Sequence, residues 1–277
     1  MLAIELWAGA IVVLYVVLRA RRDPRPPAFL ARMALLALAA WAAENSVIRA
    51  YDFYTYAPEW SFFVDRVPLL IALIWPVVVH SGIDLARRLV GDRPVPVAFA
   101  VAGLVLADAS LIEPICVRAG LWWWSEPGLW NVPVIGILGW AVFAGLAAFV
   151  LTTFEARRAS QCLVLLIAPI ASHVVLVALW WALFRWIEGA VAELPVVIVA
   201  WALSLALAWG ASRSSAAARV PLAELLLRVP GALFFFVLLT TIAPPALLVL
   251  YALSFAAPYL ALTVRAARVA RSARELR

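Results

Sequence analysis

Three acidic residues, Glu44, Asp108 and Glu113, lie in segments that are otherwise apolar and long enough to cross a membrane. An ionisable side chain inside a bilayer costs several kcal/mol and normally faces the protein interior, so each one is a functional hypothesis. At 1.5 Å per helical residue, Glu44 and Asp108 would lie ~24 Å and ~21 Å from the same membrane face, and Glu113 about 7 Å farther out. Two carboxyl groups in different environments can serve as acid and base. We assign these roles to Glu44 and Asp108, and expect Glu113 to tune or position one of them.

Aromatic residues crowd the connections that follow these acids. The first connection contains Tyr54 and Tyr56, and the second contains the run Trp122-Trp123-Trp124. An aromatic belt at the membrane interface would also explain tyrosine and tryptophan at this depth. Aromatic faces stabilise positive charge, however, and do so more strongly where water is excluded. A protonated carboxyl group beside such a cage is suited to protonating an electron-rich alkene and holding the carbocation until it meets water, meets an internal double bond or loses a proton.

An internal repeat underlies this arrangement. Glu44 is followed by an aromatic connection, a Val-Pro pair and Trp75, and Asp108 is followed by an aromatic connection, a Val-Pro pair and Trp140. The spacing from Val-Pro to Trp is identical in the two copies, and a weaker third copy contains His173. We therefore expect the substrate-binding residues to be Asn45, Asp52, Tyr54, Tyr56, Trp75, Trp122, Trp123, Trp124 and Trp140.

The composition requires a membrane around these residues. Hydrophobic residues make up 67% of the 277 and charged residues 14%, against ~45–50% and ~25% in soluble proteins. No water-soluble fold hides that much apolar side chain, and a disordered chain, a collagenous chain, a disulfide scaffold and a soluble nucleic-acid binder are excluded as well. With two cysteines, Cys116 and Cys162, and two histidines, the sequence has no metal-ligand motif, and we expect no metal and no cofactor.

The predicted fold class is an all-α polytopic membrane bundle of about eight or nine transmembrane helices. The apolar segments lie at about 2–19, 28–50, 67–87, 94–113, 132–152, 161–184, 194–212, 229–242 and 245–264. The segment at 229–242 is short and ends at a Pro-Pro pair, so a re-entrant hairpin there is the alternative. Residues 214–228 resemble an amphipathic surface helix with Arg219, Glu224 and Arg228 facing water.

All 22 basic residues are arginine, and every second connection is rich in them. By the positive-inside rule this alternation places the N-terminus outside and the C-terminus in the cytoplasm of a plasma or inner membrane. We expect one transmembrane domain over residues 1–277. It would contain helix-pair repeats at about 28–87, 94–152 and 161–212, and a less regular hairpin at 229–264.

The residues around the two acids resemble the signatures of an integral-membrane carotenoid-biosynthesis family. That family includes the bacterial carotenoid 1,2-hydratases and bisanhydrobacterioruberin hydratases. The resemblance covers roughly residues 40–145. It rests on Glu44, Tyr54-Thr55-Tyr56, Val67-Pro68 through Trp75, Asp108 through Glu113-Pro114, Gly120 through Trp124, Val132-Pro133 and Gly139-Trp140.

The resemblance implies that the protein adds water across a terminal double bond of an acyclic carotenoid or related isoprenoid. The partners would be this lipidic substrate, entering from the bilayer, and the membrane lipids, with no nucleic acid. An isoprenoid cyclase that begins with the same protonation is the alternative enzyme, and a carotenoid- or lipid-binding protein is the alternative without catalysis. A transporter fits less well, because its polar residues should line a path through both halves of the membrane.

Overall fold

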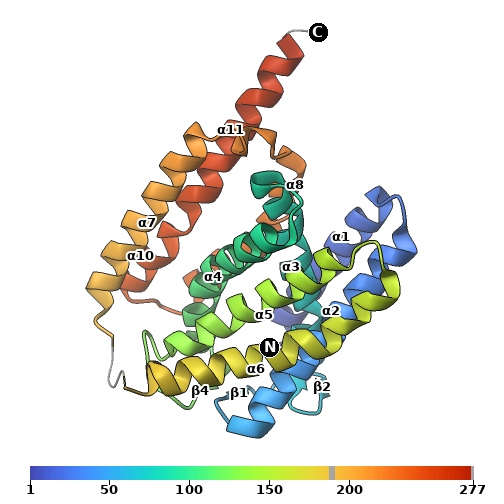
Figure 1. The fold of residues 1–277 in the computed structure, drawn as a ribbon. Helices are drawn as coiled ribbons and strands as arrows, with labels where there is room; N and C mark the ends of the chain where they lie inside the picture. The colour runs from blue at the N-terminus through green and yellow to red at the C-terminus, as the bar shows by residue number, and fades with distance from the viewer. Residues whose placement is uncertain (187–190, 276–277) are drawn as a thin grey trace.

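The computed structural model describes residues 1–186 and 191–275, and the described chain is a bundle of long helices (Figure 1). Its first half contains α1 (Leu2–Arg22), α2 (Pro26–Tyr51), α3 (Leu69–Val90), α4 (Pro94–Arg118) and α5 (Val134–Thr153). The next part of the chain contains the 3-10 helix η1 (Arg158–Leu163), α6 (Val164–Ala182), the 3-10 helix η2 (Phe184–Trp186) and α7 (Glu193–Arg213). The C-terminal part consists of the 3-10 helix η3 (Ala217–Arg219), α8 (Leu222–Leu226), α9 (Val229–Thr241), α10 (Ala246–Ser254) and α11 (Ala256–Glu275).

Within the described residues, nine helical segments are long and apolar enough to cross a membrane. The prediction of an all-α polytopic bundle is therefore confirmed. The doubtful eighth segment is one of the nine, because α8 and α9 together give a stretch of 20 residues from Leu222 to Thr241.

Two groups of helices make up the bundle. The helices α2 to α6 pack in sequence-neighbour pairs, with α6 returning to lie against α2, whereas α7 packs against α10 and α11 along one side (Figure 1). The contact of α4 with α5 is close because Gly145 lies directly over Ala98 and Ala102. A Cβ atom at Gly145 would come within 3.0 Å of the Ala102 Cβ atom. Small residues at a crossing let two membrane helices approach and pack their backbones together.

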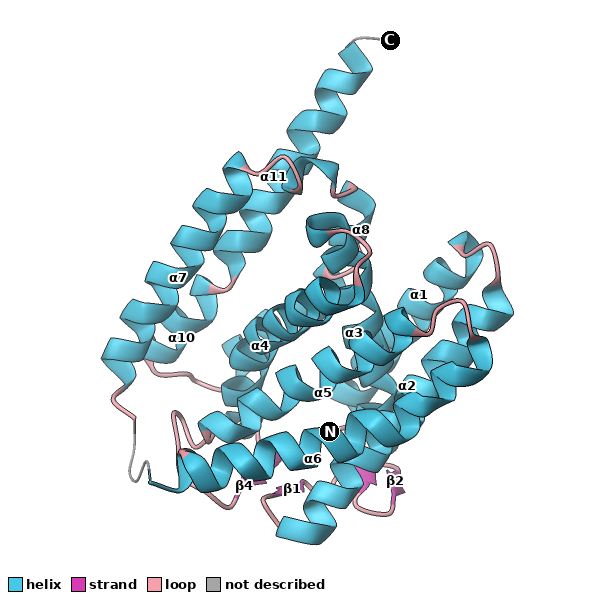
Figure 2. Cartoon of the chain, viewed as in Figure 1, coloured by secondary structure: helices cyan, strands magenta, loops and turns pink. Residues whose placement is uncertain are grey.

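In the described part of the chain, four short strands lie at one end of the bundle, opposite the end from which α11 projects (Figure 2). They are β1 (Tyr54–Tyr56), β2 (Phe63–Val64), β3 (Val67–Pro68) and β4 (Trp122–Trp124). β2 pairs with β3 within one connection, whereas β1 pairs with β4 from a different connection. The β1–β4 pair therefore joins the loop after α2 to the loop after α4.

The expectation for residues 214–228 was wrong in two respects. Pro221 interrupts the segment, which forms only η3 and α8. Arg228 does not face water: its side chain is 15% exposed and forms an ion pair with Asp108.

Candidate active site

The register of the β1–β4 ladder decides which aromatic side chains face the helices. The strands are antiparallel, and Tyr54 lies opposite Trp124 while Tyr56 lies opposite Trp122. Because successive side chains of a strand point to opposite faces, the four outer positions of the ladder share one face. Tyr54, Tyr56 and Trp122 are buried there. The central residue Trp123 points the other way and is 47% exposed.

Glu44 lies beneath this face and accepts three hydrogen bonds. The Tyr54 hydroxyl donates to Oε2 of Glu44, the Tyr56 hydroxyl donates to the same oxygen at 2.8 Å, and the Trp75 indole N–H donates to Oε1 at 2.9 Å. The carboxyl group is thus held by two residues of β1 and one residue of α3. All three donors are neutral, and Glu44 is only 8% exposed.

Glu113 is held in a parallel way by the other strand. The indole N–H groups of Trp122 and Trp124 both donate to its Oε2 atom, at 2.8 and 3.0 Å. Glu113 is 1% exposed. Helix α4 continues past Pro114 to Arg118, so Glu113 lies inside the helix and not at its end. An indole N–H can donate but cannot accept, so Trp122 and Trp124 fix Oε2 as an acceptor.

The two halves of the site also contact each other through their rings. The Tyr54 and Trp124 ring centroids are 4.7 Å apart, and those of Trp75 and Trp140 are 4.6 Å apart. A glycine makes room for one of these rings: a Cβ atom at Gly136 would come within 2.6 Å of the Trp124 ring.

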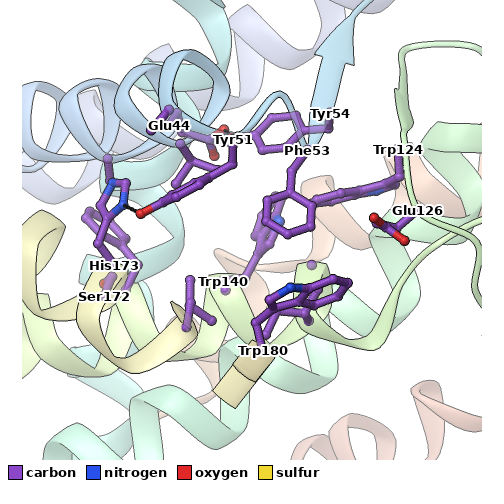
Figure 3. Close-up of a pocket in the computed structure, with 18 of the residues that line it drawn as sticks. Glu44, Tyr51, Phe53, Tyr54, Trp124, Glu126, Trp140, Ser172, His173 and Trp180 are labelled. Carbon is purple, nitrogen blue, oxygen red and sulfur yellow. Dashed lines mark hydrogen bonds between the residues drawn. The ribbon is translucent and has the colours of Figure 1, made fainter. Parts of the chain in front are cut away.

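A cavity of about 570 Å³ is lined by both Glu44 and Glu113, and Figure 3 shows it on the Glu44 side. This size falls within the ~300–1,000 Å³ of typical small-molecule sites. Trp140 and Trp180 face its interior, and Tyr51 and His173 lie at one side of it (Figure 3). The cavity also reaches the surface of α6, because Trp181 lines it and is 61% exposed.

Burial keeps the tyrosine hydroxyls of the site protonated. It raises the pKa of Tyr54 and of Tyr56 well above the usual value, and the neighbouring negative charge of Glu44 raises both further. Each hydroxyl therefore retains the proton that it donates to Glu44.

Asp108 does not join the cavity. Its carboxyl group accepts hydrogen bonds from Arg228 and from the Tyr259 hydroxyl at 3.0 Å, and Arg228 also donates to Ser81 at 2.8 Å. This cluster links α4 to α3, α11 and the start of α9. The structure thus brings Glu44 and Glu113 together and places Asp108 in an ion pair elsewhere.

Three of the predicted substrate-binding residues lie outside the cavity lining. The Asn45 side chain donates a hydrogen bond to Asp65 at 2.8 Å. Hydrogen bonds from Arg49 and from Asn45 lower the pKa of Asp65 to about 2. Asp52 ends α2 in the left-handed conformation with φ 50°. Trp123 lies on the outer face of the ladder. The other six, Tyr54, Tyr56, Trp75, Trp122, Trp124 and Trp140, all line the cavity.

The cavity also contains residues that the sequence analysis did not assign to the site. Tyr51 is the last residue of α2, Phe53 and Glu126 come from the two connections, and Ser172, His173 and Trp180 come from α6. The weak third copy of the repeat, which contains His173 and tryptophans, was the signal that could have identified α6. Among the described residues, no three His, Cys, Asp or Glu side chains are placed to hold a metal ion.

The fold and the site define a multi-pass membrane protein with paired carboxyl groups in an aromatic cavity. The chain belongs to the carotenoid biosynthesis protein family, whose family model matches residues 2–207. This match confirms the resemblance inferred from the motifs and contains every residue that lines the cavity. Neither a curated protein nor a solved structure matches the chain.

Proposed function

We propose that the protein hydrates a terminal double bond of an acyclic carotenoid or related isoprenoid by protonating it within this cavity. The observation that carries the proposal is the placement of two buried carboxyl groups, Glu44 and Glu113, in one aromatic cavity with neutral hydrogen-bond donors only. Membership in the carotenoid biosynthesis family supports an isoprenoid substrate.

The hydrogen bonds favour different roles for the two carboxyl groups. Glu44 accepts from three donors that reach both of its oxygens, which is the arrangement that stabilises a carboxylate. The hydrogen bonds that Trp122 and Trp124 donate to Glu113 both end on Oε2, and we assign the transferable proton to Oε1. Like charges in one cavity disfavour ionisation of both groups. We therefore assign the proton donor to Glu113 and the charge-stabilising carboxylate to Glu44.

The reaction would proceed through a carbocation. The proton of Glu113 would bond to the less substituted carbon of the terminal alkene, and the positive charge would form on the more substituted carbon. The negative charge of Glu44 and the faces of Trp75, Trp124 and Trp140 would stabilise that charge in a cavity from which bulk water is excluded. Water would then attack the cation, and its surplus proton would return to the carboxyl pair.

The cavity fits one end of a long polyene and not the whole chain. Its opening beside Trp181 would let the remainder of the substrate lie along α6 and the lipid.

The test is expression of the protein in cells that make lycopene, followed by mass spectrometry of the extracted pigments. We expect a gain of one water for each modified end. An isomer of unchanged mass would show that the protein is a cyclase and not a hydratase. Unchanged lycopene that copurifies with the protein would show that the protein binds the carotenoid without converting it. An inserted Glu113→Gln variant, which preserves shape and the acceptor oxygen, should give unmodified pigment.

A further inference from the structure

Tyr51 and His173 form a second polar group in the same cavity, on the side away from Trp122 and Trp124. Nε2 of His173 lies 2.8 Å from the Ser46 hydroxyl, and Nδ1 lies 3.2 Å from the Tyr51 hydroxyl. Tyr51 and His173 both line the cavity, and Figure 3 shows the Tyr51 oxygen directed at the imidazole ring.

The hydrogen bonds of Ser46 decide the tautomer of this histidine. The hydroxyl of Ser46 has one proton and lies 2.6 Å from the Ala42 carbonyl oxygen, to which it donates. This short contact favours the arrangement in which Ser46 accepts from His173, and we assign the ring proton to Nε2 on that ground. Nδ1 is left with its lone pair, and the Tyr51 hydroxyl donates to it. The pair is therefore set to take up a proton at Nδ1.

Helix α2 places Tyr51 on the same side as Glu44 and about two turns farther along. Tyr51 follows Glu44 by seven residues on α2. Seven residues are close to two full turns, so both side chains lie on one stripe of the helix, ~10 Å apart along its axis. Glu44 and the Tyr51–His173 pair therefore line the same cavity at different positions along α2.

A third group can hold the water. Ser172 precedes His173 on α6, lines the cavity and is 4% exposed. Its hydroxyl has no hydrogen-bond partner in the described part of the chain. A buried hydroxyl normally finds a partner, so this one is available to a polar ligand.

We propose that Ser172 positions the attacking water and that Tyr51 and His173 remove its proton. This inference rests on the proposed function. The water oxygen bonds to the tertiary carbocation, one water proton passes to the Tyr51 oxygen, and the Tyr51 proton passes to Nδ1 of His173. After the product has left, the histidinium gives up its proton and Glu113 regains one, so the net reaction is addition of one water.

Deuterium exchange separates this step from alkene protonation. A cation that forms but is not captured loses a neighbouring proton, and in D₂O this leaves deuterium on carbon in the recovered substrate. With membranes containing the full-length protein, lycopene and D₂O buffer, we expect His173→Gln to hydrate about 10²-fold more slowly while deuterium still enters the recovered lycopene. Tyr51→Phe and Ser172→Ala should shift the same partition in the same direction, which keeps the test open if one variant does not insert.

The chain supplies a matched control in His80. Its Nδ1 atom lies 3.0 Å from the Tyr15 hydroxyl, as Nδ1 of His173 lies near the Tyr51 hydroxyl, but it also lies 3.3 Å from Oδ2 of Asp84, and His80 is outside this cavity. We expect His80→Gln to leave the ratio of hydration to exchange unchanged.

The outcomes distinguish the two proposals. Neither water addition nor exchange by the wild type would overturn the proposed function together with this inference. Normal hydration by His173→Gln, or loss of hydration and exchange together in an inserted His173→Gln, would overturn only the inference. Glu126 is a further carboxyl group in the cavity lining, so a switch to exchange in Glu126→Gln but not in His173→Gln would assign the base to Glu126 instead.

Discussion

Glu113 and Asp108 lie five residues apart on α4 but have opposite surroundings. Glu113 accepts hydrogen bonds from two neutral indoles and borders a cavity, whereas Asp108 is paired with the guanidinium group of Arg228. Five residues correspond to a rotation of about 140° around a helix, so the two side chains leave the helix on different sides. An ion pair with an arginine stabilises the ionised form of a carboxyl group and so disfavours its protonation. A carboxyl group that is held by neutral donors beside a cavity can exchange a proton with a ligand. An acid in a membrane helix therefore needs both neutral donors and a cavity before it is assigned to chemistry.

Replacing the carboxyl groups should give the largest effect. We expect Glu113→Gln to lower turnover about 10²–10⁴-fold, because it removes the general acid. Glu44→Gln should lower it about 10²–10³-fold, because it removes the negative charge opposite the cation. Asp108→Asn should keep turnover within a few-fold of the wild type for the inserted protein. Pigment conversion per unit of inserted protein measures all three.

Of the three acidic residues, Asp108, whose replacement should change turnover least, should matter most for the stability of the folded protein. Removing one partner of a buried ion pair costs about 3–5 kcal/mol, so Asp108→Leu should sharply lower the midpoint of unfolding in detergent. The double variant Asp108→Leu with Arg228→Met should recover most of the loss, because no unpaired charge remains buried. If the single and double variants unfolded alike, the pairing of Asp108 with Arg228 would not account for the role of Asp108.

Gly136→Ala tests the packing of the Glu113 half of the site. The added methyl group would overlap the Trp124 ring and displace its indole N–H from Glu113. A misplacement of about 1 Å can cost ~10²-fold in rate, and overpacking typically costs about 1–3 kcal/mol. The matched control is Gly139→Ala, where the new Cβ atom meets only a Leu176 methyl group at 3.6 Å. Equal turnover for the two variants would contradict this packing argument.

Tyr54→Phe and Tyr56→Phe should have intermediate effects. Each removes one hydrogen bond to Glu44 and leaves the ring in place. A hydrogen bond to a charged group contributes about 1.5–3 kcal/mol, so we expect each variant to lower turnover and the double variant to lower it further. Conversion rates of the four proteins, compared as a double-mutant cycle, measure how far the two hydroxyls act together.

Substitution on the outer face of the β1–β4 ladder should have the smallest effect on turnover. Trp123→Phe changes a ring on the outer face and should leave turnover unchanged, whereas Trp122→Phe removes a donor to Glu113. Equal losses in the two variants would mean that the alternation of the ladder does not select the functional tryptophans. Pigment conversion by the two proteins is again the measurement.

Much of the fold could be predicted because it follows from composition. Runs of apolar residues of bilayer length predict spanning helices without any knowledge of packing, and the aromatic residues at Tyr54, Tyr56, Trp122 and Trp124 identified the end of the bundle that holds the cavity. The division into helix-pair repeats and the orientation in the membrane stay predictions.

The errors came from contacts between distant segments. Matching Glu44 to Asp108 relied on spacing to the Val-Pro pair, whereas the hydrogen bonds match Glu44 to Glu113. Glu44 precedes its two strand donors by 10 and 12 residues, and Glu113 precedes its two donors by 9 and 11. Arg228 was expected at the surface because nothing local indicates that Asp108, 120 residues away, faces it. Strand alternation within Trp122-Trp123-Trp124 was a local signal that could have removed Trp123 from the site.

Proton transfer to carbon can be measured with the wild-type protein and Glu113→Gln side by side. Membranes containing each protein are incubated with lycopene in D₂O buffer, and the products are analysed by mass spectrometry after back-exchange of hydroxyl deuterium. The wild type should give a hydrated product with one carbon-bound deuterium per added water, and Glu113→Gln should give neither hydration nor deuterium on carbon. Hydrated product without carbon-bound deuterium, or full activity of Glu113→Gln, would contradict acid catalysis by the carboxyl pair.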